Sequence, residues 1–203
     1  MKDKEDMADK ITITLGTSNP HKVFEINKIA KPFDIEFLPL KSENFNPNEN
    51  GETFEENAKI KAMEAAKVSN CGNYFMADDS GLCVDFLNGA PGIHSARYAE
   101  TPDKRIEKLL LNLKEDKKRC AHFVCALCLV DNKGNILHTE NGIVKGKIAH
   151  SKKGTNGFGY DPVFIVDGIN KTMAELSEDE KNTLSHRGKA LFNMIKWIKS
   201  NLN

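Results

Sequence analysis

The stretch that decides the fold is RCAHFVCALCLVDNKGNILHTENGIVKGKIAH, residues 119–150. Its first part is a long apolar run rich in strand-forming residues, and its last part continues as a second strand-like segment. The polar residues 132–135, with Lys133-Gly134 at their centre, predict the turn that joins the two segments. The stretch therefore predicts a long antiparallel pair of strands that forms one lobe of the protein.

Strands and helices alternate in the residues before this pair. Apolar residues alternate in ITITL (11–15), and IEFLPL (35–40) predicts a second strand. The spacing of apolar residues predicts a helix at 20–31, with Asn19 as its N-cap, and another at 53–70. This order of elements predicts an α/β domain built around a mixed sheet.

Local signals predict where the next elements begin and end. Thr53 and Glu56 have the spacing of a capping box, and Gly72 is expected to end the helix that they begin. YFMA (74–77) predicts a short strand, and we expect the residues that follow it, Asp78-Asp79-Ser80-Gly81, to form a turn at the end of that strand.

The remaining signals complete the pattern of an α/β protein. Asn88-Gly89 predicts a turn, and Thr101-Pro102 opens a helix that should reach about Lys114. VFIV (163–166) predicts a strand, and the last helix is expected to begin at Ser185.

The composition is that of an ordinary globular protein. Of the 203 residues, 39% are hydrophobic and 29% are charged, which predicts one domain at 11–203 after a charged, disordered tail at 1–10. The 29 basic and 29 acidic residues give a net charge of zero, which argues against nucleic-acid and membrane partners. We see neither an apolar signal-peptide core nor a membrane span, so we expect a cytoplasmic protein.

Cys125 and Cys128 have the spacing of a C-x-x-C motif, which can bind metal or act in redox chemistry. They lie in the apolar strand segment, where a redox motif would instead open a helix and a zinc site would need a second pair of ligands. Alternation along a strand would place them, with Cys120 and His122, on mixed faces. We therefore expect buried core thiols in a reducing compartment.

The first strand-to-helix turn, TSNPHK (17–22), has the features of an anion site. Free backbone N–H groups and the positive end of the helix dipole point at a ligand there, and Lys22 adds a full charge. The turn is not a Walker loop. Taken alone, it is more often a plain N-cap followed by a solvated lysine.

The adjacent carboxylates Asp78 and Asp79 could hold a divalent cation. Mg²⁺ needs one or two carboxylates, with waters and phosphate oxygens as its other ligands, and Glu49 is a candidate second carboxylate. The alternative for 78–81 is an Asx turn, in which the side chains bond their own backbone. Glu49 could equally belong to a solvated, acidic helix start.

Two later segments offer groups that suit a nucleotide base. The glycine-rich loop GTNGFGYDP (154–162) carries Phe158 and Tyr160, whose rings could stack on a base, and Asp161, which could accept hydrogen bonds. At 185–188, SHRG places cations at a helix N-terminus, where they oppose the dipole unless an anion or an electron-rich ligand compensates. Together these segments supply what hydrolysis of a nucleotide phosphoanhydride needs.

The sequence resembles the inosine triphosphate pyrophosphatase family. The segments that carry the resemblance are TSNPHK (17–22), GETFEENAKIKA (51–62), ADDSGLCVDFLNGAPGIHSARYA (77–99), GTNGFGYDPVF (154–164) and SHRGKAL (185–191). The resemblance implies a two-lobed α/β fold with a central cleft, and a homodimer. It also implies Mg²⁺-dependent hydrolysis of the deaminated purine nucleotides ITP, dITP and XTP to the monophosphate and pyrophosphate.

The resemblance also implies roles for individual residues. Asp79 matches the metal-binding proton acceptor, and Glu49 matches the second metal ligand. The substrate contacts that it implies are Thr17, Ser18, Asn19, Pro20, His21, Lys22, Lys61, Ser80, Arg97, Phe158, Gly159, Tyr160, Asp161, Lys181, His186 and Arg187.

Two other functions remain open. A related pyrophosphatase could act on modified pyrimidine nucleotides, although FGYD (158–161) and SHR (185–187) favour a purine. A non-catalytic nucleotide-binding module would have no need of the carboxylates Glu49 and Asp79 as a hydrolytic metal site.

Overall fold

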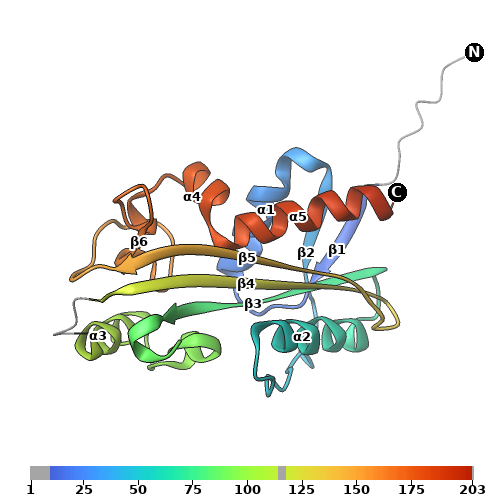
Figure 1. Ribbon diagram of the computed structural model, residues 1–203. Helices are drawn as coiled ribbons and strands as arrows, with labels where there is room; N and C mark the ends of the chain where they lie inside the picture. The colour runs from blue at the N-terminus through green and yellow to red at the C-terminus, as the bar shows by residue number, and fades with distance from the viewer. Residues whose placement is uncertain (1–9, 114–117, 203) are drawn as a thin grey trace, which may run out of the picture.

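The predicted hairpin forms the two longest strands of the sheet and runs along the length of the molecule (Figure 1). In the computed structural model, which describes residues 10–113 and 118–202, β4 (Cys120–Asp131) pairs antiparallel with β5 (Ile136–Ile148). The carboxylate of Asp131 accepts hydrogen bonds from the backbone N–H groups of Lys133 and Asn135, which fixes the turn. The hairpin and its turn are therefore confirmed.

The hairpin belongs to a six-stranded mixed sheet with the strand order β2-β1-β3-β4-β5-β6. The strands β1, β2 and β3 are parallel, whereas β3, β4, β5 and β6 pair antiparallel. The remaining strands are β1 (Ile11–Leu15), β2 (Ile35–Pro39), β3 (Tyr74–Val84) and β6 (Phe164–Val166). The predicted α/β class with a mixed sheet is confirmed.

Helices cover both faces of this sheet, with α1, α4 and α5 on one face and α2 and α3 on the other (Figure 1). The α-helices are α1 (Pro20–Ala30), α2 (Phe54–Val68), α3 (Pro102–Asn112), α4 (Glu178–Leu184) and α5 (His186–Asn201). Short 3-10 helices are η1 (Lys31–Phe33), η2 (Asp85–Leu87), η3 (Gly92–Arg97), η4 (Asp161–Val163) and η5 (Met173–Glu175). None of the described helices combines the length and apolar character needed to cross a membrane.

The hydrophobic core is divided between two ends of the long strands. At one end, buried side chains from β1, β2, α1 and α5 pack on one face of the sheet, and those of α2 pack on the other face. At the other end, a separate cluster joins α3, β6 and the far parts of β3, β4 and β5. Two lobes are thus present, as predicted. The long strands run through both of them, so the prediction that the hairpin forms one lobe is wrong.

The connections of β1 determine where a ligand can bind. The chain leaves β1 through α1 to reach β2 on one side, and later passes through α2 to reach β3 on the other side. In open α/β sheets, the crevice at such a reversal, outside the carboxyl end of the strand, is the usual ligand site. Within the described residues, β1 pairs with β3 only at Phe75 and Met76, so β3 continues into the other lobe without β1 beside it.

The prediction of a turn at 78–81 is wrong. All four residues lie inside β3 and pair with β4, from Asp78 opposite Leu127 to Gly81 opposite Val124. Glycine is needed at 81 for close packing, because a Cβ there would lie 2.4 Å from the carbonyl oxygen of Gly92 in η3. The strand therefore places Asp78 and Asp79 on opposite faces of the sheet.

The predicted start of α2 at Thr53 is confirmed, but its capping box and two predicted helix ends need correction. The Thr53 side chain accepts the expected hydrogen bond from the Glu56 N–H, but the Glu56 carboxylate accepts from the N–H of Glu52 and not from that of Thr53. The helix α2 ends at Val68, before Gly72, because Ser69 already has extended backbone angles. The helix α3 ends at Asn112, and residue 114 lies outside the described residues.

Cys125 and Cys128 are buried in core clusters on opposite faces of the sheet. Burial raises the pKa of Cys125 to about 12 and that of Cys128 to about 11, so both remain protonated thiols. The prediction of core thiols is confirmed. Of the predicted tail, residues 1–9 lie outside the described residues.

Candidate active site

A cavity of about 610 Å³ lies at the carboxyl end of β1, between the two lobes. Its volume is within the range of pockets that bind small organic ligands. Among the described residues, every predicted site residue lines this cavity except Pro20, which begins α1. The fold therefore brings segments that are far apart in the sequence to one cleft.

The turn between β1 and α1 is held by its own side chains. The Thr17 hydroxyl accepts a hydrogen bond from the Asn19 N–H at 3.2 Å, and the Asn19 side chain accepts one from the His21 N–H at 3.0 Å. This confirms the predicted N-cap. The alternative of a plain N-cap followed by a solvated lysine is wrong for Lys22, because its Nζ lies 3.0 Å from Oδ2 of buried Asp78.

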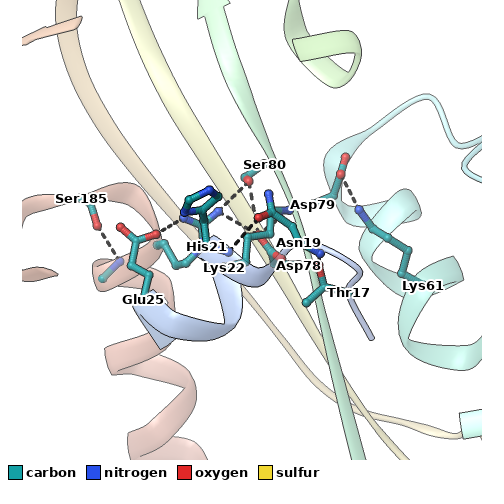
Figure 2. Close-up of polar contacts among 12 residues, drawn as sticks. Thr17, Asn19, His21, Lys22, Glu25, Lys61, Asp78, Asp79, Ser80 and Ser185 are labelled. Atoms are coloured by element: carbon teal, nitrogen blue, oxygen red, sulfur yellow. Dashed lines mark hydrogen bonds and ion pairs between the residues drawn. The ribbon is translucent and has the colours of Figure 1, made fainter. Parts of the chain in front are cut away.

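The two aspartates of β3 point to different helices (Figure 2). Asp78 faces α1 and α5, where it pairs with Lys22 and with Arg187 at 3.1 Å. Burial acts to raise the pKa of Asp78, but these two cations hold that pKa well below its ordinary value. Asp78 is thus a permanently charged, structural carboxylate.

Asp79 faces α2, where its Oδ1 lies 2.6 Å from the Nζ of Lys61 (Figure 2). Burial raises the pKa of Asp79 above its ordinary value, although Lys61 opposes that shift. Its second oxygen, Oδ2, is buried and has no hydrogen-bond partner within the described chain. Asp79 therefore has a free acceptor and a stronger tendency to take a proton than an ordinary aspartate.

Glu49 and Asp79, the two predicted metal ligands, converge on one ammonium group. The Nζ of Lys61 lies 2.6 Å from Asp79 and 3.6 Å from Glu49, and Arg97 lies 3.7 Å from the same Glu49 oxygen. The described residues contain no group of three or more His, Cys, Asp and Glu side chains placed to hold a metal ion. Two carboxylates with a free oxygen nevertheless fit Mg²⁺, which takes its other ligands from water and phosphate.

A chain of buried ion pairs runs from this end of the cleft to the other. Arg187 joins Asp78 to Glu25, and Lys181 joins Glu25, at 3.0 Å, to Asp161, at 2.8 Å. Burial acts to raise the pKa of Glu25, but Arg187 and Lys181 lower it. Glu25 and Asp78 of the protein itself therefore compensate the charge of Arg187 at the start of α5.

The guanidinium of Arg187 is largely engaged inside the protein. Its Nη1 donates to Glu25, and its Nη2 donates to Asp78 and to the hydroxyl of Ser80 at 2.9 Å. The Nε has no hydrogen-bond partner among the described residues. Arg187 is a predicted substrate contact, and its Nε–H is the donor that has no partner within the described chain.

The glycine-rich loop presents one aromatic ring, not two. Phe158 is half-buried, stacks on His21 with ring centres 5.4 Å apart, and has the Lys181 Nζ 4.9 Å from its ring centre. Tyr160 is buried and donates a hydrogen bond to the carbonyl of Ser95 at 3.1 Å. The prediction that both rings could stack on a base is thus wrong for Tyr160.

Asp161 and His186 are also more buried than the sequence suggested. Asp161 accepts hydrogen bonds from the Phe158 N–H and from Lys181, so it shapes the loop from inside. His186 stacks on Phe123 with ring centres 4.7 Å apart. Burial lowers the pKa of His186 to about 3, so its ring is neutral near pH 7.

Several residues of the site were missed by sequence reasoning. Glu25 is buried in α1 one turn after Lys22, a spacing that places both on one helix face. Ser177 and Glu180 form a capping box that begins α4, the unpredicted helix that carries Lys181. That box has a recognisable sequence spacing, whereas Arg105 and Phe123 line the cleft without any local signal.

The fold and the cleft define an α/β protein with a charged small-molecule site between two lobes. The family model described as "Ham1 family" matches residues 13–197, and the chain belongs to this family. A dITP/XTP pyrophosphatase of Exiguobacterium sp. is 48% identical, over 88% of this chain and 92% of the relative. One of Clostridium perfringens is 47% identical, over 87% and 92%.

Solved structures of the family have the same fold. The Ham1 protein of Staphylococcus aureus is 39% identical with a TM-score of 0.81, covering 93% of this chain and 98% of its own. A HAM1 protein from Coxiella burnetii is 38% identical, also with a TM-score of 0.81, covering 94% and 99%. The similarity extends through both lobes and across the cleft.

Proposed function

We propose that this protein hydrolyses the deaminated purine nucleoside triphosphates ITP, dITP and XTP to the monophosphate and pyrophosphate, with Mg²⁺. The Ham1 family match and the relatives named dITP/XTP pyrophosphatase support this activity. The observation that carries it is the single cleft, in which paired lysines and carboxylates lie at one end and the half-buried ring of Phe158 lies at the other.

The triphosphate binds at the carboxyl end of β1. Lys22 approaches from α1 and Lys61 from α2, on opposite sides of β3, and the N-terminus of α1 supplies backbone N–H groups. When bound by Glu49 and Asp79, Mg²⁺ supplies neutralisation of the charge on the phosphate oxygens.

Asp79 acts as the base. One carboxylate oxygen of Asp79, not the one that would bind the metal, accepts a proton from a water molecule, whose oxygen attacks the α-phosphorus while the bond to the β,γ-pyrophosphate breaks. Lys22 and Lys61 hold the phosphate chain, so the first products are the monophosphate and pyrophosphate.

The base lies against Phe158, near the start of α5. The ring of His186 and the Nε–H of Arg187 have hydrogen-bonding atoms without partners among the described residues. A donor there pairs with the C6 oxygen of hypoxanthine or xanthine but opposes the amino group of adenine. A site that hydrogen-bonds one such group can reject its analogue by about 10⁴-fold.

A substrate panel tests this proposal against the two alternatives. Purified protein with Mg²⁺ should release pyrophosphate from ITP and XTP much faster than from ATP, dUTP or a methylated UTP. Preference for the pyrimidines would favour the second enzyme, and binding of ITP without turnover would favour a non-catalytic module. The homodimer and the cytoplasmic location stay predictions, and size-exclusion chromatography tests the first.

A further inference from the structure

Lys61 occupies the position between the two carboxylates that are proposed to hold the metal. Its side chain is 8% exposed, and its Nζ contacts Asp79 at 2.6 Å and Glu49 at 3.6 Å. The Asp79 side chain is itself 9% exposed, with its Oδ2 buried and unpartnered within the described chain. A fixed positive charge thus stands where two metal ligands meet.

A divalent ion and this ammonium group cannot share the two carboxylates without a cost. Opposite charges hold Lys61 to Asp79 in a poorly solvated cleft, and a second cation beside it would be repelled strongly at such short range. Replacing the lysine contact requires another anion for Lys61. The phosphate chain of the substrate is such an anion, and Lys61 lines the same cavity.

We infer that, when no nucleotide is bound, the ammonium group of Lys61 occupies the position of the divalent ion between Asp79 and Glu49. The ion therefore binds together with the nucleotide and not before it. The inference rests on the proposed function, because it takes Glu49 and Asp79 as metal ligands and Lys61 as a phosphate contact. Lys61 is therefore a positioning residue that also keeps the unloaded site from binding metal.

The other cations of the cleft cannot do the same. Lys22 is held on the opposite face of β3 by Asp78, and Arg97 contacts Glu49 at 3.7 Å but, within the described residues, does not pair with Asp79. Lys61 alone in the described chain is paired with both candidate ligands. Removal of its charge should therefore expose the metal site.

Binding of Mn²⁺ in the absence of nucleotide tests the inference, with free Mn²⁺ measured by electron paramagnetic resonance. Lys61→Met and Lys61→Gln should each bind one Mn²⁺ at least about tenfold more tightly than the wild type. The control is Lys67→Met on the same helix, whose side chain is 76% exposed, and it should bind like the wild type. Asp79→Asn, added to Lys61→Met, should abolish the gain.

Wild-type protein that binds Mn²⁺ as tightly as the Lys61 variants, with binding lost in Asp79→Asn, would overturn the inference. This comparison includes the wild type, so it holds even if one Lys61 variant folds poorly. Hydrolysis of ITP is measured on the same wild-type preparation. Failure of that hydrolysis counts against the proposed function, whereas equal Mn²⁺ affinities in an active preparation count against the role of Lys61 alone.

Discussion

At the scale of single residues, each acidic side chain that lines the cleft is paired with a cation of the described chain before any ligand arrives. Asp78 and Asp79 are adjacent in sequence, yet their surroundings move their pKa values in opposite directions. Two strong cationic partners stabilise the charge on Asp78, while burial dominates for Asp79. Environment, not residue type, therefore assigns structural and chemical roles.

The matched variants Asp78→Asn and Asp79→Asn separate these roles. Asp78→Asn should lower the free energy of unfolding by roughly 3 kcal/mol, because it removes the buried partner of Lys22 and leaves Arg187 paired with Glu25 alone among the described carboxylates. Asp79→Asn should reduce kcat by at least about 100-fold. It should cost less stability than Asp78→Asn, because burial already disfavours the charge on Asp79 and Lys61 keeps Glu49 as a partner. Urea denaturation and ITP turnover measure both, and the reverse order of effects would refute the assignment.

His186 predicts a pH dependence of stability. In the folded state the pKa of His186 is about 3, below its ordinary value of 6.5. As the pH falls below 6.5, the unfolded chain therefore binds a proton at His186, whereas the folded chain does not. Stability should therefore fall from pH 6.5 toward pH 3. His186→Phe keeps a ring against Phe123, and its unfolding free energy should fall less steeply over that window. Identical slopes would contradict the buried, neutral histidine.

At the scale of elements, Tyr160 connects the glycine-rich loop (154–162) to η3. Its hydroxyl reaches the carbonyl of Ser95, while the Ser95 hydroxyl accepts a hydrogen bond from the Leu82 N–H of β3. The loop that carries Phe158 is thus tied to the segment that carries Arg97. This bond explains why an aromatic residue in a glycine-rich loop is buried.

Tyr160→Phe tests that connection by removing one oxygen atom. The unfolding free energy should fall by about 1 kcal/mol, and KM for ITP should rise more than kcat falls, because Phe158 loses its support. Tyr98→Phe is the matched control, since the Tyr98 hydroxyl contacts Asn112 in an exposed bond and its loss should be nearly neutral. Equal effects of the two substitutions on the unfolding free energy and on KM would show that the Tyr160 hydroxyl does not hold the glycine-rich loop against η3.

At the scale of the whole molecule, the sequence carried enough local information for the framework. Alternation and turn residues predicted the β4–β5 hairpin, and almost every site residue that the resemblance implied lines the cleft. Local signals failed where distant partners decide. Ser80-Gly81 has turn chemistry, yet pairing with β4 keeps it extended. Tyr160 donates a hydrogen bond to Ser95, 65 positions away in the sequence, and Glu25 accepts one from Arg187, 162 positions away.

Hydrolysis of ITP in ¹⁸O-labelled water tests the central claim most directly. Attack on the α-phosphorus places the labelled oxygen in IMP, so ³¹P NMR should show labelled IMP together with unlabelled pyrophosphate. Label in the pyrophosphate would move the attack to the β-phosphorus. Release of orthophosphate with IDP would contradict the account of this cleft altogether.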